Sequence, residues 1–391
     1  MATRLATFDS VSPTISDDYL SWLTRELASH AEACDRSGEF PRAPFDLLAR
    51  EGLIGLTVPR ELGGRGANLA EALRVLGAVA KGEPSTALIL FMTYHYHANP
   101  HRAQGWPAAI YERMAKEAVA GRGLIGGLRV EPELGTPVRG GLPATTARRT
   151  AEGWIISGKK IYSTGSTGLD WYSVWAKTDE AEPRVGNFLV KAGSPGVTIE
   201  PAWDHLGMRA TVSHAIHFAD TPTPLDHAVD TRLPKQWAAT AGDPGLAAWN
   251  ALAISTIYDW LARAARDWLA SYLNDRMPAN LGASLATLPR VQEKVGEIEA
   301  LLQVNATLIR DAAVHYDAGD SPSATAVNNI KYVATANAIR AVEIGLELTG
   351  NPGLSRANPL ERHYRDMLCS RIHSPQTDTI LVAAGRAVLG Q

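Results

Sequence analysis

Residues 203–224 read WDHLGMRATVSHAIHFADTPTP, and the character of the chain changes within this stretch. The first half is a glycine-containing loop, whereas VSHAIHFAD at 212–220 is a short run with Val, Ile and Phe, residues that favour extended backbone. Similar short runs begin near Gly123, with turn residues between them. Residues 122–232 are therefore predicted to form a compact antiparallel β-barrel domain.

Helical spacing of apolar residues dominates on both sides of this β region. Before it, the spacing holds from Ser16 to about Ala120, and after it come three segments that are each long enough for a bundle helix. The chain thus predicts an α+β protein with three parts. These are an N-terminal helical domain (1–121), the middle β domain (122–232) and a C-terminal four-helix-bundle domain (233–391).

The composition is that of an ordinary globular protein, and it argues against several functions. A formal net charge of −3 gives no electrostatic reason to bind nucleic acid. Two cysteines, Cys34 and Cys369, are too few for a disulfide framework or a zinc site, and no metal is expected. The sequence shows neither a signal peptide nor an apolar run of about 18 residues, so we expect a cytoplasmic protein without a membrane partner.

Six motifs follow one another along nearly the whole chain. They are LAREGLIGLTVPRELGGRG (48–66), RVEPELGTP (129–137), GKKIYSTGS (158–166), the stretch at 203–224, LELTGNPGL (346–354) and LERHYRD (360–366). In this order they resemble the acyl-CoA dehydrogenase superfamily. The resemblance implies a flavin in the crevice between the β domain and the C-terminal helices, and a homo-oligomer that is usually a tetramer.

The segment GKKIYSTGS at 158–166 offers neutral groups that suit a flavin ring, which needs an apolar slot and a few hydrogen-bond donors. Tyr162 could cover the ring, Ser163 and Thr164 are hydroxyl donors, and Gly165 permits a close backbone approach. In the family, the matching segment carries an aromatic residue and then a threonine that reaches flavin N5. The resemblance therefore assigns these two roles to Tyr162 and Thr164.

The resemblance implies further cofactor contacts elsewhere in the chain. The segment at 129–137 matches the loop around the pyrimidine ring and pyrophosphate, and Arg276 matches an arginine that reaches the flavin phosphate of a neighbouring subunit. The additional positions assigned to cofactor binding are Glu131, Gly135, Thr136, Arg276, Gln376 and Thr377. The Phe-Gly turn that holds the adenine side of FAD in the family is replaced after Arg276, so FAD and FMN both stay open.

The position of the general base departs from the dehydrogenase pattern. Removal of the proton alpha to a thioester requires a base, almost always Glu, beside the alpha carbon. The resemblance places this Glu shortly after the pair Arg365–Asp366, but the chain has Ser374 there. A neutral serine cannot abstract such a proton unaided, so dehydrogenation would require a displaced carboxylate, for which Asp243 and Asp259 are candidates.

A second branch of the superfamily lacks this Glu. The flavin monooxygenases that resemble dibenzothiophene monooxygenase, and the amino-sugar N-oxygenases, use O2 with reduced flavin that a separate reductase delivers. Such chemistry requires a dry pocket, a hydroxyl near N5, and groups that exchange protons near neutral pH. The candidate catalytic residues are Ser163 and Thr164, His373 on the base loop, and His95 on a helix that lines the substrate cavity in the family. A histidine on an apolar helix is more often a core residue than a catalytic one, so that alternative stays open for His95.

Three functions stay open on the sequence. The favoured one is a flavin-dependent monooxygenase acting on a small apolar or heteroatom-containing substrate. The alternative is an FAD-dependent acyl-CoA dehydrogenase or oxidase with a displaced base. The third is a flavin-binding protein with little turnover, of a kind that includes a nucleic-acid-associated branch. Long C-terminal helices with more apolar surface than one bundle can bury predict a dimer or tetramer.

Overall fold

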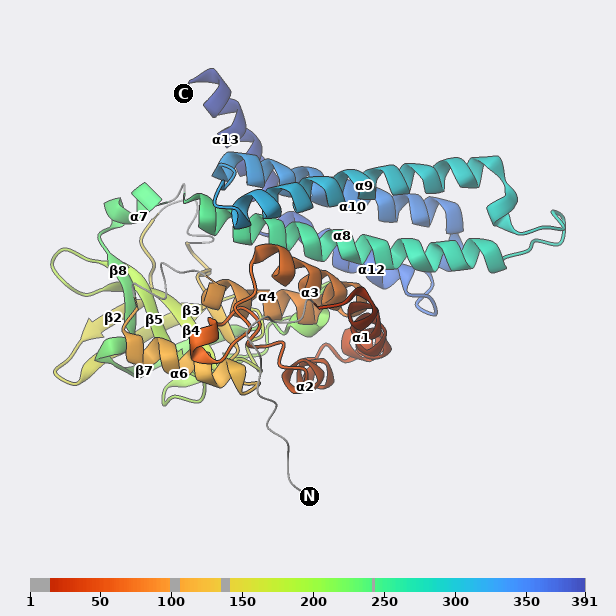
Figure 1. The fold of residues 1–391 in the computed structure, drawn as a ribbon. Helices are drawn as coiled ribbons and strands as arrows, with labels where there is room; N and C mark the ends of the chain where they lie inside the picture. The colour runs from red at the N-terminus through yellow and green to blue at the C-terminus, as the bar shows by residue number, and fades with distance from the viewer. Residues whose placement is uncertain (1–14, 99–105, 135–140, 241–242, 391) are drawn as a thin grey trace.

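The computed structural model describes residues 15–98, 106–134, 141–240 and 243–390. Figure 1 shows the N-terminal helices and the strands side by side, with the long C-terminal helices across the top of both. The predicted α+β class and the order of helical, β and helical parts are confirmed. The boundaries of the three domains as separate units stay predictions.

The N-terminal helices pack on one another and against the C-terminal bundle. α1 begins after Ser16, whose hydroxyl accepts a hydrogen bond from the Tyr19 amide, and it ends at Gly38 in left-handed backbone. α3 approaches α8 closely because Gly77 lacks a side chain: a Cβ there would lie 2.3 Å from the indole nitrogen of Trp260. The helical elements are α1 (Asp17–Ser37), α2 (Arg42–Arg50), η1 (Arg60–Leu62), α3 (Leu69–Gly82), α4 (Pro84–Ala98) and α6 (Ala108–Val119).

The β region forms one sheet whose strands follow the order β6-β7-β3-β2-β4-β5-β8, with β1 paired to β4. The strands are β1 (Ile125–Leu128), β2 (Thr146–Arg149), β3 (Gly153–Lys160), β4 (Trp171–Thr178), β5 (Val185–Lys191), β6 (Val197–Glu200), β7 (Ala215–Pro224) and β8 (Ala228–Arg232). Two short helices, η3 (Arg209–Thr211) and η4 (Leu225–His227), flank β7. Trp171, Phe188 and Ile216 are among the side chains that the sheet buries completely or nearly so.

The sheet is mixed, which corrects the prediction of a wholly antiparallel one. β4 runs parallel to both β1 and β2, while the other pairs among the described strands are antiparallel. Parallel neighbours need a long connection, and β3 supplies it by leaving β2 as a hairpin before the chain returns on the other side of β2 as β4. The described residues show no pairing between β6 and β8 that would close a barrel.

The C-terminal part is a helical bundle in which α8, α9 and α10 are long and α12 packs beside α8 and α10 as a shorter fourth helix. Its elements are α7 (Pro234–Thr240), α8 (Pro244–Asp275), η5 (Leu285–Thr287), α9 (Pro289–Asp317), α10 (Ala324–Thr349), α11 (Asn351–Leu354), α12 (Leu360–Leu368), η6 (Cys369–Ile372) and α13 (Thr377–Leu389). Figure 1 shows α13 projecting from the bundle. None of the helices in the described part of the chain combines the length and apolar character of a membrane-spanning segment.

Candidate functional site

The turn after β3 holds three of the predicted flavin contacts in a row. Tyr162 has left-handed backbone (φ 54°), which a residue with a side chain adopts only where its surroundings hold it. Its side chain is 56% exposed and lies edge-on to Trp203, with ring centroids 6.4 Å apart. Ser163 is fully buried, and its amide donates to the carbonyl of His214. Thr164 is partly buried, so the turn presents an aromatic ring and two hydroxyls.

A buried ion pair fixes the strand that leads into this turn. Lys160 Nζ lies 2.6 Å from Glu131 Oε1 and donates to the carbonyl of Trp175, while Glu131 also accepts from the amides of Ala144 and Thr145. Burial lowers the pKa of Lys160 to about 8. Burial alone would raise the pKa of Glu131, but the hydrogen bonds from Lys160 and Thr145 lower it. The Glu131 carboxylate is thus engaged inside the protein, and its contact with a flavin stays a prediction.

A chain of hydrogen bonds connects Thr164 with the C-terminal bundle. Thr164 Oγ1 accepts from Ser213 Oγ at 3.3 Å, and the hydroxyls of Ser213 and Thr211 are 2.9 Å apart. Thr211 donates to the carbonyl of Met208, whose amide donates to Asp366 Oδ1 at 2.5 Å. Burial raises the pKa of Asp366 to about 7. The loop between β6 and β7 therefore positions the turn at Thr164 relative to α12 and the segment that follows it.

His373 follows η6, and its imidazole bonds to a residue of α8. Its Nε2 lies 2.7 Å from the phenolic oxygen of Tyr258, a side chain that is fully buried. Burial, assisted by the positive charge of Lys331, lowers the pKa of His373 to about 3, and burial raises the pKa of Tyr258 well above its usual value. Both side chains are therefore neutral near pH 7, and together they form a pair that can hold or pass one proton.

The two carboxylates considered as displaced bases are engaged elsewhere. Asp243 caps α8 by accepting from the amides at positions 245 and 246. Asp259 is buried and accepts from Arg263 Nε at 2.8 Å, an ion pair inside the bundle. At the family's base position, the carbonyl of Ser374 accepts a hydrogen bond from the Asn250 side chain at 2.9 Å. Both candidate carboxylates are thus engaged by other groups, whereas the imidazole of His373 and the phenol of Tyr258 are at hydrogen-bond distance from each other.

The two histidines of α4 differ in their surroundings. His95 is partly buried, and its ring lies 5.7 Å from that of Phe91 and 6.2 Å from that of Tyr96. His97 is 3% exposed, and burial lowers its pKa to about 4. α4 packs against both β1 and α8, so His95 lies on a helix between the β sheet and the bundle. Its role at a substrate cavity stays a prediction.

The other residues assigned to the cofactor lie in three different segments of the sequence. Gly135 and Thr136 lie outside the described residues. Arg276 is exposed at the end of α8, which Figure 1 shows running from the sheet side to the far end of the bundle. Gln376 and Thr377 lie at the start of α13 and help line a depression of about 560 Å³ beside α10. The contacts of Arg276, Gln376 and Thr377 with a flavin stay predictions.

The turn at Ser163 and Thr164 fits the donor requirements of a flavin ring. Among the described residues, Ser163 Oγ is buried and has no hydrogen-bond partner, which is costly unless a further group satisfies it. Thr164 Oγ1 lies 3.3 Å from Ser213 Oγ, in a row of hydroxyls that continues to Thr211. Gly165, with φ 79°, keeps the backbone next to Ile89 of α4. These groups suit an uncharged, hydrogen-bonding ring edge.

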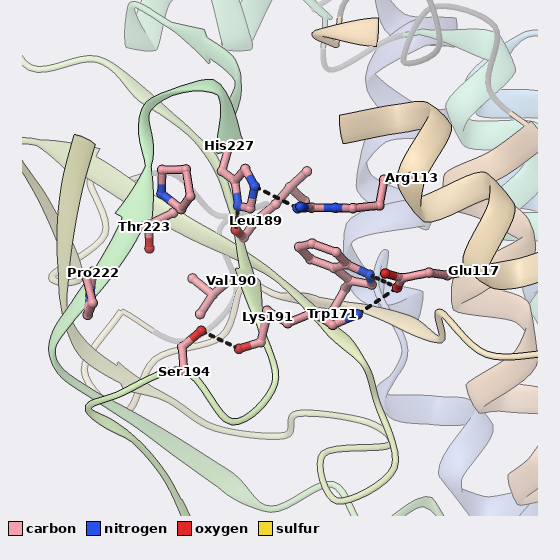
Figure 2. A pocket seen from close by; sticks show the side chains of 11 residues that line it. Arg113, Glu117, Trp171, Leu189, Val190, Lys191, Ser194, Pro222, Thr223 and His227 are labelled. Carbon is pink, nitrogen blue, oxygen red and sulfur yellow. Dashed lines mark hydrogen bonds and ion pairs between the residues drawn. The ribbon is translucent and has the colours of Figure 1, made fainter. Parts of the chain in front are cut away.

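A separate pocket of about 290 Å³ lies between α6 and the ends of β5 and β7 (Figure 2). Its charged groups bind one another: Arg113 lies 2.9 Å from His227 Nε2, and Glu117 accepts from Lys191 and from the Trp171 indole. None of the predicted site residues lines it. In the described part of the chain, no three His, Cys, Asp or Glu side chains are grouped to hold a metal ion.

Three residues at the His373 loop were missed by the sequence analysis. Tyr258 lies 115 positions before His373, in the middle of a helix with many apolar neighbours. Asn250 and Lys331 bond to backbone carbonyls, which leave no pattern in the sequence. The sequence did offer one signal for Tyr258: a residue with a hydroxyl lies among apolar residues of a long helix, and a buried hydroxyl needs a hydrogen-bond partner.

Models of the acyl-CoA dehydrogenase N-terminal, middle and C-terminal domains match residues 14–110, 130–221 and 247–381. The putative acyl-CoA dehydrogenase YdbM of Bacillus subtilis is 28% identical over 375 residues, which cover 94% of this chain and 96% of that protein.

The similar solved structures include KijD3 and a butyryl-CoA dehydrogenase, each over nearly its full length. KijD3, solved in complex with FMN and dTDP-3-amino-2,3,6-trideoxy-4-keto-3-methyl-D-glucose, has a TM-score of 0.80 and 27% identity, with 95% of this chain and 92% of that chain covered. Butyryl-CoA dehydrogenase from Megasphaera elsdenii has a TM-score of 0.85 and 22% identity, with 98% and 100% covered, and at that identity the likeness concerns the fold alone.

Proposed function

Because the chain belongs to the acyl-CoA dehydrogenase family and is a flavin-dependent oxidoreductase, we propose that it acts as a monooxygenase. It takes a reduced flavin, FMN or FAD, from a separate reductase and uses O2 on a small apolar or heteroatom-containing substrate. The bound flavin supplies two electrons, so that one oxygen atom of O2 enters the substrate and the other leaves as water.

The observation that carries this proposal is the chemistry around His373. A dehydrogenase needs a carboxylate that can take the proton alpha to a thioester. Here the base position is Ser374, Asp243 caps a helix, and Asp259 is paired with Arg263 inside the bundle. Next to this position lies the neutral pair of His373 and Tyr258 instead. Neither group titrates near neutral pH, so the pair replaces the expected neutral-pH acid–base group with a hydrogen bond along which a proton can be relayed to or from oxygen.

The residues divide the work as follows. Ser163 and Thr164 donate hydrogen bonds to the flavin edge, and Tyr162 covers the ring. His373 Nε2 and the Tyr258 hydroxyl share one hydrogen bond and move a proton to or from the reacting oxygen. Arg276 meets the flavin phosphate of a second subunit, since it is exposed at the end of α8, away from its own β sheet. Gln376 and Thr377 contact the cofactor from the start of α13.

Dehydrogenation of an acyl-CoA is the second candidate, and the names of the relatives favour it. YdbM, which matches 94% of this chain, is named as an acyl-CoA dehydrogenase. The KijD3 complex, in contrast, holds FMN and a nucleotide-linked amino sugar. The two candidates differ in one measurable property, which is whether an acyl-CoA can reduce the bound flavin without oxygen.

The test is an anaerobic titration of the flavin-loaded protein with octanoyl-CoA, followed by the visible absorbance of the flavin. We expect no bleaching in the natural protein, and slow bleaching in Ser374→Glu if the pocket admits the thioester, because that variant restores a carboxylate. Rapid bleaching of the natural protein would overturn the proposal in favour of dehydrogenation.

A second measurement follows the reduced protein after mixing with O2. We expect reoxidation in two resolved phases, and we expect His373→Ala to merge them and release more hydrogen peroxide, because a positioned acid–base group contributes about 100-fold or more to proton transfer. A single phase that is identical in both proteins would remove His373 from the reaction. Flavin binding, measured by fluorescence quenching, shows that each variant is loaded.

A further inference from the structure

Lys331 of α10 is a buried cation with an unusual set of partners. Its side chain is 3% exposed, and Nζ donates to the carbonyl oxygens of His373 and Pro375, each at 2.6 Å. In the described residues it forms no ion pair with a carboxylate, although an ammonium group is costly to bury. Burial lowers its pKa to about 8, so it is largely protonated at neutral pH. Two backbone carbonyls therefore take the place of a counterion.

Other side chains complete the set of bonds to the same three residues. Asn250 of α8 donates to the carbonyl of Ser374, which lies between the two carbonyls that Lys331 binds. Tyr258, two turns further along α8, bonds to the imidazole of His373. We call residues 373–375 with these contacts the clamped loop. Each of its three carbonyls thus has a side-chain donor from the bundle.

We propose that Lys331 is the positioning residue that holds His373 in place for the reaction. This inference rests on the proposed function of His373. Residues 373–375 lie between η6 and α13, in neither a helix nor a strand, and their carbonyls accept hydrogen bonds from side chains of the bundle. A single ammonium that binds the first and third carbonyls fixes the backbone on both sides of Ser374, and with it the direction of the imidazole.

The charge of Lys331 has a second consequence for His373. A nearby positive charge disfavours a second one, so Lys331 opposes protonation of the imidazole. The groups that face His373 are Lys331 from α10 and Tyr258 from α8, and Tyr258 in turn faces Asp366 and Cys369. The same side chain thus fixes the backbone at His373 and adds to the effect of burial, which is the larger cause of the lowered pKa of the imidazole.

The first test does not depend on the reaction. Hydrogen exchange measured by mass spectrometry on the flavin-loaded protein should show exchange at residues 372–377 at least about tenfold faster in Lys331→Met, because charge-assisted hydrogen bonds are lost. The matched control is Lys294→Met, which removes a partly exposed ammonium paired with Glu297 on α9. Unchanged exchange at 372–377 in a folded Lys331→Met variant would overturn the inference.

Asn250→Ala covers the case in which Lys331→Met does not fold. It removes only the middle bond of the clamped loop, and we expect faster exchange confined to the same segment. Unchanged exchange there would count against the clamp in the same way, whatever the result with Lys331.

The second test reads the effect on His373. In Lys331→Met, the acid limb of the pH profile of peroxide release should shift to higher pH, because the pKa of the imidazole rises when the neighbouring charge is removed. Lys294→Met should keep the natural profile. If exchange at the loop accelerates but the profile is unmoved, Lys331 is structural only and the positioning role is wrong. If the natural protein proves to be a dehydrogenase, the proposed function is wrong, but the exchange measurement still tests whether Lys331 holds residues 373–375.

Discussion

The protonation state of His373 can be measured through its effect on stability, using the variant His373→Gln. Glutamine keeps a group that can bond to the Tyr258 hydroxyl but does not titrate. In the natural protein the pKa of His373 is lowered from 6.5 to about 3. Between these two pH values the histidine is protonated in the unfolded chain and neutral in the folded one. Stability should therefore be unaffected above pH 6.5 and should fall as the pH decreases toward 3.

The magnitude at pH 5 follows from these two values. The unfolded histidine gains RT ln(1 + 10^1.5), which is about 2 kcal/mol, from protonation, while the folded histidine gains almost nothing. The result hardly depends on the folded pKa as long as that value stays below about 4. The loss of stability between pH 7.5 and pH 5 should therefore be smaller by about 2 kcal/mol in His373→Gln than in the natural protein.

The assay is urea unfolding followed by tryptophan fluorescence at the two pH values. His363→Gln is the matched control, because His363 is buried and its pKa is likewise lowered to about 3 by burial, although it has no part in the proposed chemistry. Like His373→Gln, His363→Gln should lose less stability than the natural protein between pH 7.5 and pH 5, but its peroxide release should stay at the natural level. If His363→Gln shows the effect and His373→Gln does not, the folded imidazole of His373 is protonated at pH 5 like the unfolded one, and the desolvated imidazole described for the site is wrong.

Three further outcomes are expected. Thr164→Val should weaken flavin binding about fivefold by fluorescence titration, since one hydrogen bond contributes about 1 kcal/mol, whereas Thr167→Val, at an exposed hydroxyl in the same turn, should bind normally. Glu131→Gln should cost about 3 kcal/mol or more in urea unfolding because it leaves a buried ammonium unpaired, while Glu200→Gln in an exposed pair should cost little. Light scattering should show a dimer or tetramer that Leu389→Glu on the exposed α13 weakens, and a monomer at micromolar concentration would refute this.

The layout of helices and strands could be predicted from the sequence because local spacing of apolar residues carries it. The run at 212–220 lies in and beside β7, and the long periodic segments became α8, α9 and α10. The parallel pairing of β4 with β1 and β2 could not be predicted, since it depends on where β3 leads the chain in space. Periodicity identifies a strand but not its neighbours.

The candidate site was predictable in its parts and not in its contacts. Ser163 and His373 were singled out by their motifs, but the partner of His373 is Tyr258, 115 positions away. Glu131 shows the opposite case, because a motif suggested a cofactor contact and the structure gives its carboxylate an ion pair with Lys160. Long-range pairing of polar side chains is decided by packing, which a single sequence does not encode locally.

The hydrogen-bonded loop from Ser213 to Met208 has a consequence for dividing or recombining this protein. The amide of Met208 donates to Asp366, 158 positions further along the chain, and Met208 is connected through Thr211 and Ser213 to Thr164. The turn at Thr164 is therefore held in place only when the last helices are present. An excised β fragment would leave this loop without its anchor. A chimera that joins this β region to the bundle of a relative should retain the turn only if the bundle brings an acceptor at the position of Asp366.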